Sequence, residues 1–238
     1  MQFIQNKAVL ENFIETCLPL LDVDESYMLA LFARKKYLPE DSPVKLNGIT
    51  QLRREFADSR ISLLRKISMF ELVSNPYTDK NGLCIPEDCM TLYLMPNPRS
   101  NRLAAANLST RVIGSLFQSD NIRLTSMART ELHKACSRKT YLDFDIDVEC
   151  PDILPDILDK VCGFLGHSRI VMVHTKGGAH ILLDKNTLDP AIKNTFYQNI
   201  QKLSDSMSGE IEIRGDCLVP IPGCRQGDYT PSFCKRGV

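Results

Sequence analysis

The stretch Tyr141-Leu-Asp-Phe-Asp-Ile-Asp-Val148 alternates apolar and acidic residues along its whole length. Side chains in an extended strand point alternately to opposite faces, so this period of two predicts a strand with two unlike faces. One face is entirely apolar and is expected to pack on a core. The other face carries three aspartates: Asp143, Asp145 and Asp147.

The acidic face is unusual for a strand that is half buried. Like charges at neighbouring same-face positions repel by about 1 kcal/mol or more in a partly dry site, which favours a bound cation or open water. Carboxylates one pleat apart are typical ligands of divalent metals such as Mg²⁺ or Mn²⁺, which activate an attacking oxygen and stabilise a leaving phosphate. The alternative is a solvated acidic face that protects a strand from aggregation.

Strands and helices alternate around this stretch from about residue 80 onwards. Further strands are expected at residues 89–95, 169–175, 179–184 and 211–221. Helices are expected at residues 102–118, 151–165 and 194–207. This interleaving predicts a sheet layered by helices, and we assign the chain to the α+β class.

Residues 1–79 have a different pattern and predict a helical N-terminal extension. Apolar residues recur at spacings of three and four in the segments 11–21, 25–38 and 49–73. The pairs Asn75-Pro76 and Asn81-Gly82 are typical of turns, which places a boundary near residue 80. Residues 80–238 would then form the second unit.

Two more motifs follow the acidic strand. In Val173-His-Thr-Lys-Gly-Gly-Ala-His180, the glycine pair predicts a tight hairpin turn. Such a turn can also offer backbone N–H groups to a phosphate, with the side chains of Thr175, Lys176 and His180 as further donors. In GDCLVPIPG (215–223), Asp216 is a lone acid, which is either a turn residue or a ligand.

Taken in chain order, FDID (144–147), TKGGAH (175–180) and GDCLVPIPG resemble the three motifs of the archaeo-eukaryotic primase superfamily. The resemblance covers roughly residues 90–230 and implies a catalytic core in which an RRM-like sheet packs against a second α/β unit. It implies three metal ligands: Asp145, Asp147 and Asp216. It also implies a set of side chains and backbone that binds the incoming nucleotide phosphates: Thr175, Lys176, Gly177 and His180.

Three aspartates stand where the family has two, so the metal pair is either Asp143 with Asp145 or Asp145 with Asp147. We favour the second pair because FDID is the closer match to the family motif. The segment YLMPNPRSN (93–101) is similar to the start of the second unit in some phage and plasmid members. There, Asn97 or Arg99 would face the template or the nucleotide.

The resemblance implies a DNA primase or primase-polymerase that adds nucleotides from nucleoside triphosphates, with Mg²⁺ or Mn²⁺, along a single-stranded DNA template. A helicase or other replication proteins are further partners to consider. A nuclease would use the same two-metal carboxylate site for hydrolysis, and this alternative stays open. So does a non-catalytic RRM-like nucleic-acid-binding module, although such modules present aromatic residues where this strand presents aspartates.

Composition sets the remaining expectations. The chain has 238 residues, 43% of them hydrophobic and 24% charged, which are the proportions of an ordinary globular protein. Its formal net charge is zero, so nucleic-acid binding must depend on local basic clusters. These clusters comprise Arg34, Lys35 and Lys36, then Arg53 and Arg54, then Lys134, Arg138 and Lys139.

Location and metal content can also be weighed from the sequence. No apolar run approaches the ~18 residues of a membrane span, so we expect no membrane contact and a cytoplasmic setting, bacterial, phage or plasmid-borne. Four residues, Cys84, Cys89, His133 and Cys136, could supply zinc ligands, but their loose spacing favours free thiols instead.

Overall fold

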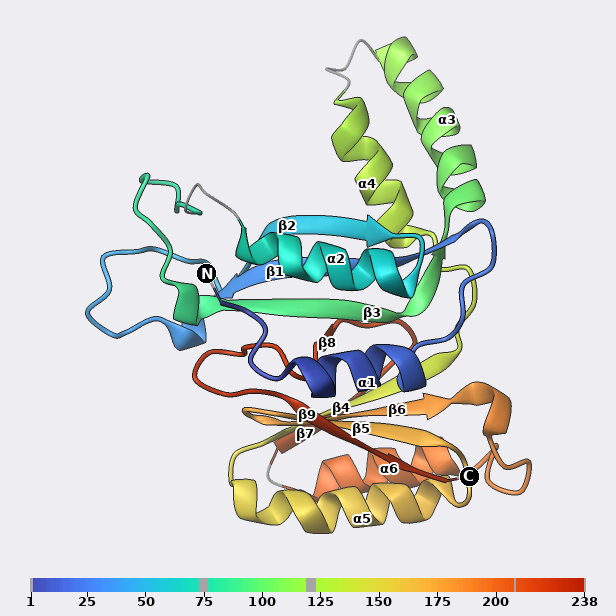
Figure 1. The fold of residues 1–238 in the computed structure, drawn as a ribbon. Coiled ribbons are helices and arrows are strands. Elements are labelled where there is room, and N and C mark those ends of the chain that lie inside the picture. Colours follow the sequence, from blue (N-terminus) through green and yellow to red (C-terminus); the bar gives the residue numbers. More distant parts are fainter. Residues whose placement is uncertain (1, 73–76, 119–122, 208, 238) are drawn as a thin grey trace.

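The computed structural model describes residues 2–72, 77–118, 123–207 and 209–237, and these form two antiparallel sheets with six α-helices (Figure 1). The expected α+β class is confirmed. The first sheet has the order β2-β1-β3-β8, with β2 at Ile49–Ala57, β1 at Glu25–Arg34, β3 at Met90–Ser100 and β8 at Val219–Pro220. The second has the order β7-β4-β6-β5-β9, with β7 at Gly209–Arg214, β4 at Tyr141–Val148, β6 at Gly178–Asp184, β5 at Ile170–Thr175 and β9 at Ser232–Arg236.

The second sheet is built from the chain order β4-α5-β5-β6-α6-β7, with α5 at Leu154–Leu165 and α6 at Phe196–Ser206. This is the split βαβ arrangement, in which the first and third strands of the unit lie at its centre. Both helices cover one face of the sheet (Figure 1). The apolar face of β4 enters the core beneath them through Phe144 and Ile146, as the period of two predicted.

The N-terminal region differs from the sequence-based expectation. Helices form at α1, Lys7–Cys17, and α2, Arg60–Glu71. The expected helix over residues 25–38 is wrong, and the one expected over residues 49–73 is wrong for its first part, residues 49–57. Residues 25–38 are mainly β1 and residues 49–57 are β2, and β1 pairs with both β2 and β3. The first sheet therefore takes strands from both sides of residue 80.

Physical reasons account for both errors. β1 is buried along most of its length, and a continuous apolar run such as Tyr27–Ala33 cannot be told from a buried helix by periodicity. For β2 the missed signal is Ser59, whose Oγ accepts a hydrogen bond from the Ser62 backbone N at 3.1 Å. This N-cap marks the start of α2 at Arg60, eleven residues after the expected start at residue 49.

The segment expected as one strand over residues 211–221 also divides between the two sheets. Its first part is β7, which pairs with β4, and its last part is β8, which pairs with β3. The link between them contains Asp216 and therefore crosses from one sheet to the other. Of the two turns expected near residue 80, Asn81-Gly82 forms one closed by Gly82 N and Asp79 O at 3.1 Å, and Asn75-Pro76 lies outside the described residues.

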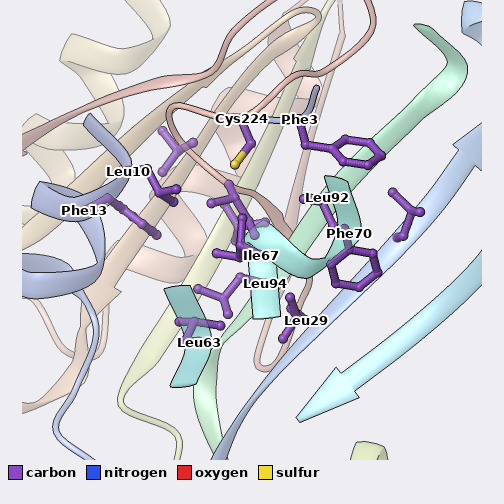
Figure 2. Packing of buried hydrophobic residues seen from close by; sticks show 14 of the residues in the cluster. Phe3, Leu10, Phe13, Leu29, Leu63, Ile67, Phe70, Leu92, Leu94 and Cys224 are labelled. Atoms are coloured by element: carbon purple, nitrogen blue, oxygen red, sulfur yellow. The ribbon is translucent and has the colours of Figure 1, made fainter. Parts of the chain in front are cut away.

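A continuous core connects the two sheets, because one cluster of buried residues includes Leu29 of β1 as well as Val171 of β5 and Leu182 of β6. Figure 2 shows the part of this core that lies around α1, α2 and the first sheet. On the first sheet it includes Leu29, Leu92 and Leu94, which pack beneath α2. It continues through Phe13 of α1, whose ring meets Phe233 of β9 edge to face at 5.3 Å between centroids. The N-terminal helix is thus part of the packing that holds both sheets together.

Helices α3, Asn101–Gln118, and α4, Leu124–Lys134, form a pair that stands away from the sheets (Figure 1). An ion pair joins them, with Arg111 Nη1 at 2.8 Å from Glu131 Oε1. Short 3-10 helices occupy Lys35–Tyr37, Glu87–Cys89, Pro151–Ile153 and Lys185–Thr187. Among the described residues, none of the helices has the length and apolar character needed to cross a membrane.

Candidate active site

A cavity of about 320 Å³ opens between the two sheets, where the acidic face of β4 meets the first sheet; we call it the cleft. The second sheet supplies one set of lining residues: Asp145, Asp147, Thr175, Gly177, His180 and Arg214. The first sheet and the segments that follow it supply the opposite set, including Phe32, Arg34, Lys36, Ile49, Tyr93 and Gln226. The cleft therefore brings together five of the predicted metal-binding and nucleotide-binding residues, and two residues of a predicted basic cluster, Arg34 and Lys36.

The three aspartates of β4 differ strongly in exposure. Asp143 is 2% exposed, the side chain of Asp145 is 17% exposed, and Asp147 is open to solvent. The row thus runs from the protein interior to the mouth of the cleft. Only Asp145 and Asp147 line the cavity, so the geometry favours them over the pair formed by Asp143 and Asp145.

Asp143 contacts His180, which lies on the neighbouring strand β6. Both carboxylate oxygens of Asp143 lie close to His180 Nδ1, at 3.0 and 3.2 Å. Burial lowers the pKa of His180, but the charge and hydrogen bond of Asp143 and the charge of Asp145 outweigh it and raise the pKa overall. His180 is thereby held with Nε2 toward Asp145, at 3.5 Å from Oδ1.

Asp145 sits between opposing influences. Burial raises its pKa, and the charges of His180 and Arg214 work against that rise while those of Asp143 and Asp147 add to it. Arg214 Nη1 lies 3.2 Å from Asp145 Oδ2. A half-buried carboxylate flanked by two others is stabilised by any cation that approaches it.

The donor set of Asp145 and Asp147 fits Mg²⁺ or Mn²⁺. These ions prefer carboxylate oxygens, and Mg²⁺ is commonly bound by one or two carboxylates together with water and substrate phosphates. Within the part of the chain that the structure describes, no three His, Cys, Asp or Glu side chains are arranged to hold a metal ion together. A metal ion bound by Asp145 and Asp147 would therefore take its remaining oxygen ligands from water and phosphate.

The wall opposite the aspartates is basic and aromatic. Arg34 Nη1 donates a hydrogen bond to the Tyr93 hydroxyl at 2.5 Å. Burial lowers the pKa of Lys36, as does the charge of Arg34, whereas the charges of Asp147 and Asp145 raise it. A ligand in the cleft would thus have carboxylates on one side and cations on the other.

Arg214 is a cleft residue that sequence reasoning missed. On β7, Ile211 and Ile213 share the face that packs on the core. Arg214 comes directly after Ile213, so its side chain lies on the opposite face. That alternation in IEIR was visible in the sequence. Its proximity to Asp145 was not, because it depends on the pairing of β7 with β4.

The glycine turn between β5 and β6 combines two different requirements. A Cβ on Gly178 would lie 1.8 Å from the Ile146 carbonyl oxygen, so this glycine is required by the close approach of β4. A Cβ on Gly177 would meet only ordinary contacts, at 3.6 Å from Asp147 Oδ1 and 3.9 Å from Lys36 Nζ. Gly177 is therefore the one that borders the cleft.

Lys176 points to a neighbouring pocket rather than lining the cleft. Its Nζ lies 2.5 Å from Asp228 Oδ1 and 5.2 Å from the centre of the Tyr37 ring. This pocket of about 450 Å³ shares Lys36 with the cleft. Lys176 is thus adjacent to the site, and its amine is engaged by a carboxylate.

Asp216 and Arg99 lie outside the residues that line the cleft and pair with each other. Arg99 Nη1 and Nη2 donate to the two carboxylate oxygens of Asp216, each at 2.7 Å, and the Arg99 side chain is fully buried. Asn97 connects the sheets, because its Oδ1 accepts from Tyr141 N at 2.8 Å and its Nδ2 donates to Tyr141 O at 3.1 Å. The three side chains fasten the end of β3 to the start of β4 and to the link after β7.

Comparison with known proteins leaves the site to be interpreted on its own chemistry. No protein-family model matches the chain, and it matches neither a curated protein nor a solved structure.

Proposed function

We propose that this chain is a nucleotidyltransferase of the primase-polymerase type, which adds nucleotides from nucleoside triphosphates to a nucleic-acid strand on a single-stranded DNA template. The observation that carries the proposal is the cleft, in which Asp145 and Asp147 face Arg34 and Lys36, with His180 beside them. Carboxylates opposite cations suit a substrate that brings both a metal ion and phosphates.

The architecture supports membership of the archaeo-eukaryotic primase superfamily, which remains part of the proposal. The β4-α5-β5-β6-α6-β7 unit has the strand order of an RRM-like sheet, and the acids lie on its central strand. The second sheet packs against the first through the shared core, and the cleft lies between the two sheets.

Each residue of the cleft has a role in the proposed reaction. Mg²⁺ or Mn²⁺ held by Asp145 and Asp147 would activate the attacking oxygen and neutralise charge on the triphosphate. His180, held by Asp143, donates from Nε2 to a phosphate oxygen. Gly177 allows a phosphate to approach the turn, and Thr175 supplies a hydroxyl donor beside it.

The two sheets also position the strand that is extended. Arg34 and Lys36 hold phosphates against the wall opposite the acids, and the aromatic residues Phe32 and Tyr93 exclude water beside them. Lys176 would bind the nucleotide only if its amine released Asp228 and paired with a phosphate instead. Asp216 as a third metal ligand and Arg99 as a nucleotide contact remain predictions, and each would have to give up its present partner.

The test is incubation with Mn²⁺ or Mg²⁺, each class of nucleoside triphosphate and an end-labelled strand annealed to a template. Lengthening of the labelled strand is expected. Shortening would instead support the two-metal nuclease, and binding without either change would support an RRM-like module. The Asp145→Asn variant serves as the control, because an activity that survives in it comes from a contaminating enzyme.

A further inference from the structure

A second concave surface lies where α4 meets the edge strand β2, outside the cleft. We call it the arginine pocket, and it is lined by Gln51, Arg54, Arg123, Thr125, Ser126 and Arg129 among others. Its volume is about 510 Å³, which is larger than that of the cleft.

Three arginines of this pocket, Arg54, Arg123 and Arg129, have no ion-pair partner among the residues that the structure describes. Within the described ranges, no carboxylate lies within 4.0 Å of the guanidinium nitrogens of Arg54, Arg123 or Arg129. The glutamates on the same two elements are already engaged, since Glu55 pairs with Arg53 and Glu131 with Arg111. The three arginines thus line one pocket, and neither Glu55 nor Glu131 pairs with them.

The guanidinium group of Arg54 is held in place at the wall of the pocket. Its Nη2 donates to Gln51 Oε1 at 2.7 Å and its Nη1 to the Arg129 carbonyl oxygen at 3.1 Å, which fixes the guanidinium plane. Its Nε is buried and has no hydrogen-bond partner. Burial lowers the pKa of Arg54, and the charge of Arg129 lowers it further; a bound anion would favour the charged form of both arginines.

The first turn of α4 adds donors of a second kind. The N-cap residue Arg123 makes no side-chain capping bond, and the backbone N–H groups at the start of a helix have no partner within the helix. The hydroxyls of Thr125 and Ser126 line the same pocket and are exposed. Guanidinium groups, hydroxyls and a helix start together are suited to phosphate.

A bulge in β2 places this pocket on the same side of the first sheet as the cleft. The register pairs Arg34 with Ile49, Phe32 with Gln51 and Ala30 with Arg54, with an irregularity between Leu31 and Phe32. Directly paired residues share a face, so Ile49, Gln51 and Arg54 all lie on the face that carries Phe32 and Arg34. Without the extra residue, Arg54 would point to the other side.

We infer that the arginine pocket binds the sugar-phosphate backbone of the single-stranded nucleic acid whose reacting end lies in the cleft. Ile49 borders the cleft, and Arg54 lies farther along the same strand. Their partners on β1, Arg34 and Ala30, are four residues apart, which is about 13 Å along the sheet. A short single strand spans that distance. The guanidinium, hydroxyl and helix-start donors of the pocket suit phosphate oxygens, so we expect binding that depends little on base sequence. The inference rests on the proposed function only in placing the reacting end of the strand.

The test measures fluorescence anisotropy of a short fluorescein-labelled oligothymidylate as the protein is added, from about 50 to about 200 mM salt. The double variant Arg54→Gln with Arg129→Gln is expected to bind at least tenfold more weakly than the unchanged protein at low salt. Each phosphate contact to a single strand contributes about 0.7 to the slope of log affinity against log salt, so the slope should flatten by about 1.4.

The matched control removes two exposed arginines elsewhere, Arg65→Gln on α2 and Arg236→Gln on β9. It carries the same change in net charge and is expected to keep both the affinity and the salt slope nearly unchanged. Equal weakening in both double variants, or no weakening in the pocket variant, would overturn the inference. So would a raised KM for nucleoside triphosphate with unchanged strand affinity, because the pocket would then be a nucleotide site.

A third variant separates this inference from the proposed function. Asp145→Asn leaves the arginine pocket intact and is expected to retain strand binding while losing nucleotide addition. If the unchanged protein binds the strand through the pocket but extends nothing with any nucleotide or metal, the proposed function fails and the pocket stands. If extension occurs and the pocket variant binds and extends as well as the unchanged protein, only the pocket inference fails.

Discussion

The three aspartates of β4 lie in different surroundings although they are the same residue type. Asp145 and Asp147 line the cleft, whereas Asp143 is buried against His180. The alternation along the strand is the same for all three, and the difference arises from how deeply each position lies between the sheets.

We expect Asp145→Asn and Asp147→Asn each to abolish nucleotide addition without loss of the fold. Removing one charge from a row of like charges relieves repulsion, so the free energy of unfolding of the metal-free protein should be unchanged or higher. Strand extension and urea unfolding measure the two effects. Asp152→Asn, an exposed carboxylate before α5, is the control and should extend normally. Near-normal extension by the double variant would exclude this metal pair.

Asp143→Asn is expected to lower the pKa of His180 in the metal-free protein. The folded-state pKa of His180 is raised above 6.5, so its pairing with Asp143 stabilises the fold fully below about pH 6.5 and is lost as pH rises through the raised pKa. In the variant this pH-dependent part of the stability should largely disappear. NMR titration of the imidazole together with unfolding at several pH values measures both. An unchanged imidazole pKa would show that Asp143 does not hold the proton on His180.

Elements are joined at a few positions where side chains or backbones approach closely. The hairpin of β5 and β6 contains two adjacent glycines with different surroundings. Gly178→Ala should destabilise the protein by about 3 kcal/mol or more, because its Cβ would collide with the Ile146 carbonyl in the centre of the sheet. Gly177→Ala is the matched control and should stay within about 1 kcal/mol. Comparable unfolding midpoints in urea for the two variants would contradict the observed strand register.

The link between β7 and β8 depends on the ion pair of Arg99 with Asp216. Asp216→Asn leaves a fully buried guanidinium without its carboxylate, so we expect a loss of about 3 kcal/mol in the free energy of unfolding. Asp228→Asn, which breaks an exposed pair with Lys176, should have a much smaller effect. Metal titration of the folded Asp216 variant tests its predicted role as a ligand. If the folded variant needs more Mn²⁺ for activity, Asp216 is a metal ligand. If the requirement is unchanged, Asp216 has only its structural role as the partner of Arg99.

The whole molecule is held together by a core that both sheets share. Phe13 is 1% exposed and connects α1 to β9 and the first sheet. We expect Phe13→Ala to cost about 3–5 kcal/mol and to lower the stability of both sheets in a single unfolding transition. Leu20→Ala, at an apolar residue that is 72% exposed, should change stability by less than about 0.5 kcal/mol. Two separate transitions would instead indicate that the N-terminal region unfolds as an independent unit.

Much of the second sheet could be predicted from the sequence because its signals are local. The period of two in β4, the apolar run and glycine pair of the β5–β6 hairpin, and the helical spacing of α5 each depend on residues close together in the chain. These local motifs, together with the family resemblance that favoured Asp145 and Asp147 over Asp143, named Asp145, Asp147, Thr175, Gly177 and His180, and the tertiary structure brings these five to one cleft.

Only the tertiary structure decided what depends on partners distant in the chain. β1 is a strand because β2 and β3 pair with it on both sides, whereas its apolar run alone is equally compatible with a buried helix. Arg214 reaches Asp145 only through the pairing of β7 with β4, and Arg99 meets Asp216 across more than one hundred residues. Residue type and alternation fix which face of a strand a side chain lies on, but its neighbours on that face are fixed by long-range pairing, which no short stretch of sequence encodes.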